Sequence, residues 1–119
     1  MYVKCNSFDF IYLSAHVEVP DEVDWRSHGA VTEVKDQGYC GSCWAFGSVE
    51  AMTDRICIAS NGTDTAHLSA EDVTSCDHLD MGCGGGIPST VYTYYAATGI
   101  VDGMNYGDTS GCWSYEGPC

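Results

Sequence analysis

The sequence predicts one helix-rich domain that ends in an irregular, glycine-rich segment. A length of 119 residues fits a single domain, and an apolar share of 45% excludes a disordered acidic tail. Helical patterns occur in three stretches, near residues 42–61, 69–76 and 88–99. Residues 100–119 show no such period, and the chain contains no internal repeat.

The first and longest helix is predicted from a single apolar stripe. Its members recur at intervals of three and four residues: Ala45, Val49, Met52, Ile56 and Ala59. This spacing places them on one face of an α-helix, where they can pack against a core. Ser42 is a suitable N-cap for this helix, and Asn61-Gly62 is a suitable stop.

Two shorter helices are predicted from the signals at their ends. Ser69 with an acidic residue, Asp72, three positions later is typical of a helix start, so a second helix is expected up to about residue 76. Pro88 suits the first turn of a third helix, and Gly99 suits its end. Between these helices, the glycine-rich run 82–86 can adopt positive φ and lets another chain segment approach closely.

The charge of the chain excludes several classes of partner. Seventeen acidic and four basic residues give a formal net charge of -13. Binding to nucleic acid phosphates or to an anionic membrane surface requires clustered Lys and Arg, which this sequence lacks. No stretch approaches the roughly 18 apolar residues of a bilayer span. The cysteines and histidines lack the spacing of a zinc site, so neither a metal nor another cofactor is predicted.

Eight cysteines in 119 residues are more than is usual in the cytosol, and they indicate an oxidising compartment. The start of the chain supplies no matching secretory signal. Its best apolar run covers only residues 10–13, and Asp9 precedes that run. This mismatch predicts that the chain is incomplete.

The segment around Cys43 has the features of a nucleophilic site. Cys43 would lie in the first turn of the long helix, where unpaired N–H groups and the helix dipole stabilise an anion such as a thiolate. Gln37 precedes it across a glycine turn, and a side-chain amide beside a backbone N–H is the minimum oxyanion hole for acyl transfer. An alternative remains open, because Cys40 and Cys43 form a C-x-x-C pair. Such a pair is also typical of a disulfide, a redox site or half a zinc site.

The same segment resembles a known family. Cys-Gly-Ser-Cys-Trp at 40–44 matches the signature of the papain-like cysteine peptidases. Val-Asp-Trp-Arg at 23–26 and the run from Gly29 to Gly38 resemble the mature start that is common in their cathepsin L-like members. Three further matches resemble the cathepsin B-like branch: Asp-Arg-Ile-Cys-Ile at 54–58, Leu-Ser-Ala-Glu-Asp at 68–72, and Gly-Cys at 111–112 with Pro-Cys at 118–119. The resemblance covers about residues 20–119. It implies an α+β papain-like fold, of which this chain would form mainly the helix-rich left lobe.

The resemblance implies roles for individual residues. Cys43 would be the nucleophile of a peptidase that works through an acyl-enzyme, and Gln37 would be the oxyanion-hole glutamine. Cys40 and Cys83 would form a disulfide between the active-site loop and the glycine-rich loop. The implied partner is an extended peptide or protein substrate, which would bind along Gly41, Gly85, Gly86, Ile87 and Pro88.

The resemblance also implies parts that this sequence lacks. The mechanism needs a His base and an orienting Asn about 130–150 residues after the nucleophile, which is farther than this chain extends. His67 and His78 lack the family context of that base. We therefore expect the β-rich C-terminal lobe to be missing and the isolated chain to be inactive. Residues 1–19 would be a non-family leader or propeptide remnant. A non-catalytic peptide-binding or decoy fragment of the same fold is the alternative.

The remaining cysteines and one sequon bear on the compartment. Apart from the nucleophile and the expected disulfide, the unassigned cysteines are odd in number: Cys5, Cys57, Cys76, Cys112 and Cys119. Cys5 is a candidate partner for Cys57, and the others would pair outside this chain. The family implies a lysosomal, vacuolar or secreted protein. Asn61-Gly62-Thr63 matches an N-glycosylation sequon and also an ordinary Asn-Gly turn.

Overall fold

The computed structural model describes residues 20–116, so the expected leader at 1–19, which includes Cys5, and the C-terminal Cys119 lie outside the described residues. Its helical elements follow in the order η1 (Trp25–His28), α1 (Cys43–Ala59), α2 (Ala70–Cys76), η2 (Gly82–Gly84) and α3 (Pro88–Thr98). Within the described range, β pairing is limited to two isolated bridges, Leu68 with Asp102 and Gly103 with Gly111. The helix-rich prediction is therefore confirmed.

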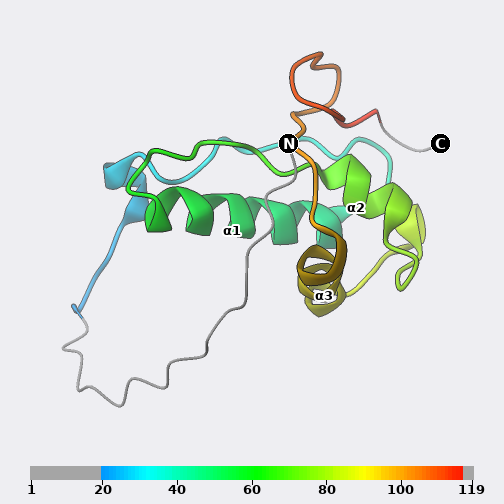
Figure 1. Cartoon of the computed structure of the whole chain (residues 1–119), viewed down its shortest axis with the longest axis horizontal. Coiled ribbons are helices and arrows are strands. Elements are labelled where there is room, and N and C mark those ends of the chain that lie inside the picture. Colours follow the sequence, from blue (N-terminus) through cyan, green and yellow to red (C-terminus); the bar gives the residue numbers. More distant parts are fainter. Residues whose placement is uncertain (1–19, 117–119) are drawn as a thin grey trace.

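Helix α1 is the central element of the fold (Figure 1). Helix α3 is seen almost end-on in that view and crosses α1 steeply, while α2 lies near the N-terminal end of α1. The apolar stripe of α1 faces these neighbours, because Ala45, Val49 and Met52 are buried and Ile56 packs against them. Only Ala59, the last residue of the stripe, is exposed.

Ser42 occupies the N-cap position of α1, as predicted, but its hydroxyl makes no capping hydrogen bond. It pairs instead with the Tyr115 hydroxyl at 2.8 Å. The Tyr115 ring is buried and meets Phe46 edge-on, with ring centroids 4.7 Å apart. A buried phenol needs a hydrogen-bond partner, and Ser42 provides it.

Two residues signalled the start of α2 in the sequence, Ser69 as the N-cap and Asp72 three positions later, and the structure gives them different roles. The Ser69 hydroxyl accepts a hydrogen bond from the Asp72 N–H at 3.1 Å, which confirms the N-cap. The Asp72 carboxylate does not return to Ser69. It accepts hydrogen bonds from the Tyr94 hydroxyl and the Val101 N–H, both at 2.9 Å. Buried Asp72 therefore connects α2 to α3 and to the segment after α3.

Helix α3 begins and ends as predicted. Pro88 is its first residue, and Gly99 follows it with a positive φ of 78° and donates its N–H to the Tyr95 carbonyl. The same segment continues to Gly103, where a Cβ atom would lie 2.0 Å from the Trp113 carbonyl oxygen. Only glycine fits at that crossing of two loops.

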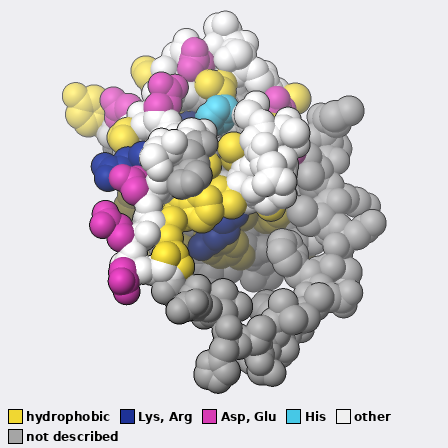
Figure 2. Space-filling model, turned by 90° about the vertical axis from the view of Figure 1, so that its left-hand side faces the viewer, with side chains coloured by type: hydrophobic (Ala, Val, Ile, Leu, Met, Phe, Trp, Pro, Cys, Tyr) yellow, Lys and Arg dark blue, Asp and Glu magenta, His cyan; other side chains and the backbone are white. Residues whose placement is uncertain are grey.

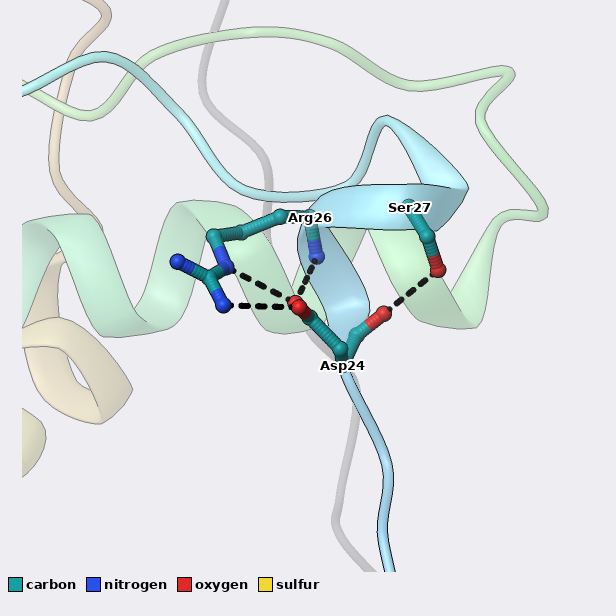
Figure 3. Close-up of polar contacts among 3 residues, drawn as sticks. All are labelled: Asp24, Arg26 and Ser27. Carbon is teal, nitrogen blue, oxygen red and sulfur yellow. Dashed lines mark hydrogen bonds and ion pairs between the residues drawn. The ribbon is translucent and has the colours of Figure 1, made fainter.

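The segment before α1 contains the short helix η1, which the sequence did not indicate. Asp24 caps it: its carboxylate accepts hydrogen bonds from the backbone and side chain of Arg26, and its carbonyl accepts one from the Ser27 hydroxyl (Figure 3). The chain then runs back along α1 towards the start of that helix (Figure 1). The Thr32 N–H donates to the Asp54 carboxylate on the way, at 3.0 Å.

Candidate active site

Cys43 is the first residue of α1, and it is exposed. The Ser42 carbonyl accepts the N–H groups of Ala45 and Phe46, so the helix turns immediately after Cys43. Among residues 20–116, the backbone N–H groups of Cys43 and Trp44 donate to no acceptor, as expected for the first positions of a helix. The thiol thus lies beside two free donors and the positive end of the helix dipole.

Gln37 lies in the turn just before this helix start. The turn is formed by Gly38, whose φ is 60° and whose N–H donates to the Asp36 carboxylate at 2.8 Å. The side-chain nitrogen of Gln37 donates to the Cys40 carbonyl at 2.8 Å. Since a primary amide carries two N–H bonds, this contact fixes the amide in the loop and leaves its second N–H available.

A disulfide joins the active-site loop to the glycine-rich loop, between Cys40 and Cys83. Beside it, the Gly41 N–H donates to the Cys83 carbonyl at 3.1 Å. A Cβ atom on Gly41 would lie 2.4 Å from that carbonyl oxygen, so only glycine allows the two loops to approach this closely. The disulfide expected from the resemblance is therefore present.

Trp44 fixes the other side of the glycine-rich loop. Its indole N–H donates to the Gly82 carbonyl at 3.0 Å, and a Cβ atom on Gly86 would lie 2.4 Å from its ring. Both backbone groups of Gly85 are used within the loop, by Gly82 and Met81. Within the described residues, both backbone groups of Gly86 are unpaired. Gly86 therefore offers an N–H and a C=O to an extended peptide, as in β-augmentation.

Ile87 and Pro88 follow Gly86 at the start of α3, and both are exposed. The Ile87 N–H donates to the Asp80 carboxylate at 2.9 Å, and the Thr90 hydroxyl donates to the same carboxylate. Asp80 thus holds the exit of the glycine-rich loop. The sequence alone did not indicate a role for this residue. The only available signal was an acidic residue shortly before a helix whose first position is proline.

His67 lies away from Cys43. The next residue, Leu68, donates its N–H to the Thr53 hydroxyl, and Thr53 is ten residues after Cys43 on α1. A rise of about 1.5 Å per residue places this contact about 15 Å along the helix from Cys43. Burial lowers the pKa of His67, and the positive charge of Lys35 lowers it further.

Other charged groups lie along α1. Burial lowers the pKa of Lys35 and raises the pKa of Glu50, so desolvation disfavours the charged form of each. His78, the second histidine after Cys43 in the sequence, is exposed in the loop after α2. Figure 2 views the C-terminal end of α1, where acidic side chains are spread over the surface and not gathered in one place.

Neither a metal centre nor a membrane span is apparent in the part of the chain that the structure describes. Within residues 20–116, no three His, Cys, Asp or Glu side chains are grouped so that they could hold a metal ion. Over the same range, every helix is too short or too polar to cross a bilayer.

Comparison with protein families identifies the class that this site defines. Residues 19–118 match the model of the papain family of cysteine proteases, and the chain belongs to that family. The cathepsin B-like cysteine proteinase of Schistosoma japonicum is 44% identical over 108 residues, 87% of this chain and 32% of that protein. Cathepsin B-like cysteine proteinase 6 of Caenorhabditis elegans is 44% identical over 107 residues, 86% of this chain and 28% of that protein.

Solved structures of cysteine proteases share the fold. The digestive procathepsin L2 proteinase of Tenebrio molitor larval midgut aligns with a TM-score of 0.70 and 37% identity, over 76% of this chain and 29% of that one. The ragweed pollen allergen Amb a 11, a cysteine protease in its proform, aligns with a TM-score of 0.68 and 40% identity, over 81% and 29%. The papain-like fold is thus confirmed. The chain spans about a third of the length of the curated relatives.

Proposed function

We propose that the protein to which these residues belong hydrolyses peptide bonds in the manner of a cathepsin B-like cysteine peptidase, with Cys43 as the nucleophile. One observation carries this proposal: Cys43 is exposed at the start of α1, three residues after the carbonyl that holds the Gln37 amide and next to Trp44, whose ring packs on Gly86. A thiol with oxyanion donors on one side and a peptide-binding edge on the other has the components of acyl transfer.

The proposed reaction proceeds in two steps. The Cys43 thiolate attacks the carbonyl carbon of an extended peptide, and the negative oxygen that forms is stabilised by the Cys43 N–H and the free N–H of Gln37. The amine leaves with the proton that the general base took from the Cys43 thiol, which gives a thioester. Water then hydrolyses the thioester to release the acid and the thiol. The Gly86 backbone would pair with the substrate strand, and Gly41, Ile87 and Pro88 would flank it.

A general base is the component that we do not assign to these residues. His67 is held about three turns of α1 from Cys43, and His78 is in the loop after α2. We therefore expect the 119-residue polypeptide alone to have little or no turnover. The base and its orienting partner would come from outside this stretch.

Turnover of a peptidyl fluorogenic amide by the whole protein tests the proposal. Cys43→Ser should abolish turnover, and Gln37→Ala should lower kcat by about 100- to 1000-fold, as loss of one oxyanion donor does. Ala59→Ser is the control, since it changes an exposed residue at the other end of α1 and should leave turnover unchanged. Full activity of Cys43→Ser would contradict the proposed nucleophile.

A non-catalytic peptide-binding role is the second candidate, favoured by the distance of His67 from Cys43. The two functions differ in the fate of a bound peptide. If the whole protein binds extended peptides but leaves them uncleaved, and Cys43 reacts with iodoacetamide no faster than Cys57 and Cys76, the binding role would be preferred.

Because the family is typically lysosomal or secreted, we propose the same compartments for this protein. The Cys40–Cys83 disulfide supports an oxidising compartment.

A further inference from the structure

The sequon Asn61-Gly62-Thr63 lies in the turn that directly follows α1. Asn61 and Thr63 are both exposed, and Asn61 has a positive φ of 51°. Asn is one of the few residues other than Gly that adopt this conformation readily, which explains its place in the turn. The same three residues can therefore form the turn and also be an acceptor site for a glycan.

The turn does not use the Asn61 side chain. Backbone bonds hold it, from the Asn61 N–H to the Ile58 carbonyl at 3.1 Å and from the Gly62 N–H to the Cys57 carbonyl at 2.9 Å. The Thr63 hydroxyl adds a bond to the Ser60 carbonyl at 2.7 Å. Within residues 20–116, the Asn61 amide makes no hydrogen bond. A sugar on that amide nitrogen would displace no contact of the fold.

We propose that Asn61 carries an N-linked glycan. The acceptor signal is the Asn-x-Thr pattern, which the chain contains once. A second, independent observation is the Cys40–Cys83 disulfide, because disulfides form in the secretory compartments in which this modification also takes place. The donor is a lipid diphosphate-linked oligosaccharide. The bond from its first sugar to phosphate breaks, that sugar bonds to the amide nitrogen, and the lipid diphosphate leaves with the amide proton going to the transferase.

The glycan would lie far from the candidate active site. Cys43 and Ala59 are the two ends of α1, about 24 Å apart along the helix axis, and Asn61 follows the far end. Figure 1 shows this end of α1 away from α2, and Figure 2 looks onto it. The glycan would shield the end of α1 without obstructing a peptide at Gly86.

The test is expression of the whole reading frame through a eukaryotic secretory pathway, followed by peptide mass spectrometry. We expect the peptide that contains Asn61 to carry one N-glycan. The glycan should be lost in Asn61→Gln and Thr63→Ala but retained in Thr63→Ser, which keeps the hydroxyl. Enzymatic deglycosylation should be run in ¹⁸O-labelled water, because Asn-Gly pairs also deamidate and would otherwise give the same Asp product.

Translation with microsomal membranes provides a second arm, because the nascent chain is modified before it folds and a poorly folding variant still reports the sequon. An unmodified Asn61 in material whose Cys40–Cys83 disulfide has formed would overturn the proposal. So would a glycosylated Thr63→Ala variant. Neither outcome bears on peptidase activity, so this inference stands or falls separately from the proposed function.

Discussion

At the scale of single residues, the candidate site depends on positions where a side chain is absent. Gly41 allows the active-site loop to touch the Cys83 carbonyl, and Gly86 allows the glycine-rich loop to touch the Trp44 ring. Both contacts are closer than any Cβ atom permits. The sequence marks these positions as glycines, but it does not say which neighbour requires them.

The two glycines that flank Cys43 should respond oppositely to alanine. Gly41→Ala places a methyl group 2.4 Å from the Cys83 carbonyl oxygen and should destabilise the fold by about 1–3 kcal/mol. Gly47→Ala lies inside α1, where a Cβ atom meets nothing within 4 Å, and should stabilise it by about 0.5–1 kcal/mol. Denaturant unfolding of the whole protein measures both. Equal effects would show that the loop contact is not as close as described.

Tyr94 should carry a pH-dependent part of the stability. Burial, with the neighbouring Asp72 carboxylate, raises the pKa of Tyr94 from 10.0 to about 12. Between these values the unfolded chain has lost the phenol proton and the folded chain has kept it. The contribution is therefore complete below pH 10 and is lost as the pH rises towards about 12.

Tyr94→Phe should remove this pH dependence. At neutral pH it should also cost about 1–3 kcal/mol, because buried Asp72 loses one of its donors. The measurement is the free energy of unfolding of both proteins between pH 8.5 and about 11. The difference between them should shrink as the pH rises. A constant difference would contradict the raised pKa. Exposed Tyr106→Phe is the control and should behave like the unchanged protein.

At the scale of elements, the two helix starts at Ser42 and Ser69 show how far local patterns extend. Both serines precede a helix and both suit an N-cap. Ser69 caps α2 because its neighbours leave the hydroxyl free to accept from Asp72, while also donating to the Trp113 carbonyl at 2.6 Å. Ser42 does not cap, because Tyr115, 73 positions later, takes its hydroxyl. The sequence pattern predicted where both helices begin, but it predicted the capping hydrogen bond correctly only at Ser69.

Ser69→Ala should therefore destabilise α2 measurably. It removes the cap of a seven-residue helix and the bond to Trp113 at a buried position, and we expect a loss of about 1–2 kcal/mol in the free energy of unfolding. Ser89→Ala is the matched control, because Ser89 is an exposed residue in the first turn of α3. It should change stability by less than about 0.5 kcal/mol. Equal losses in the two variants would contradict the capping role.

At the scale of the whole molecule, one covalent bond connects the two loops of the site. The Cys40–Cys83 disulfide spans a sequence separation of 43 residues, which contains all of α1 and α2. Closing a loop of this length restricts the unfolded chain by about 4 kcal/mol in the chain-entropy description. The bond thus stabilises the fold and also holds the glycine-rich loop beside Cys43.

Replacing both cysteines of this pair, Cys40→Ala with Cys83→Ala, should lower the free energy of unfolding by about 2–5 kcal/mol. The exposed Cys112→Ala variant is the comparison and should have a smaller effect if Cys112 is unpaired in the protein used. Urea unfolding under non-reducing conditions measures the difference. If the double variant is as stable as the parent, the disulfide does not form in the native protein.

The sequence alone determined the three helices, the position of Cys43 at a helix start and the family. These features depend on residues within a few positions of one another, where hydrophobic period, helix ends and contiguous motifs can be read directly. Only the tertiary structure decided the partners of the polar side chains: Ser42 with Tyr115, Asp72 with Val101, and Asp80 with Ile87. Most of these pairs join residues far apart in the chain, and each buried group takes whichever partner the packing brings to it.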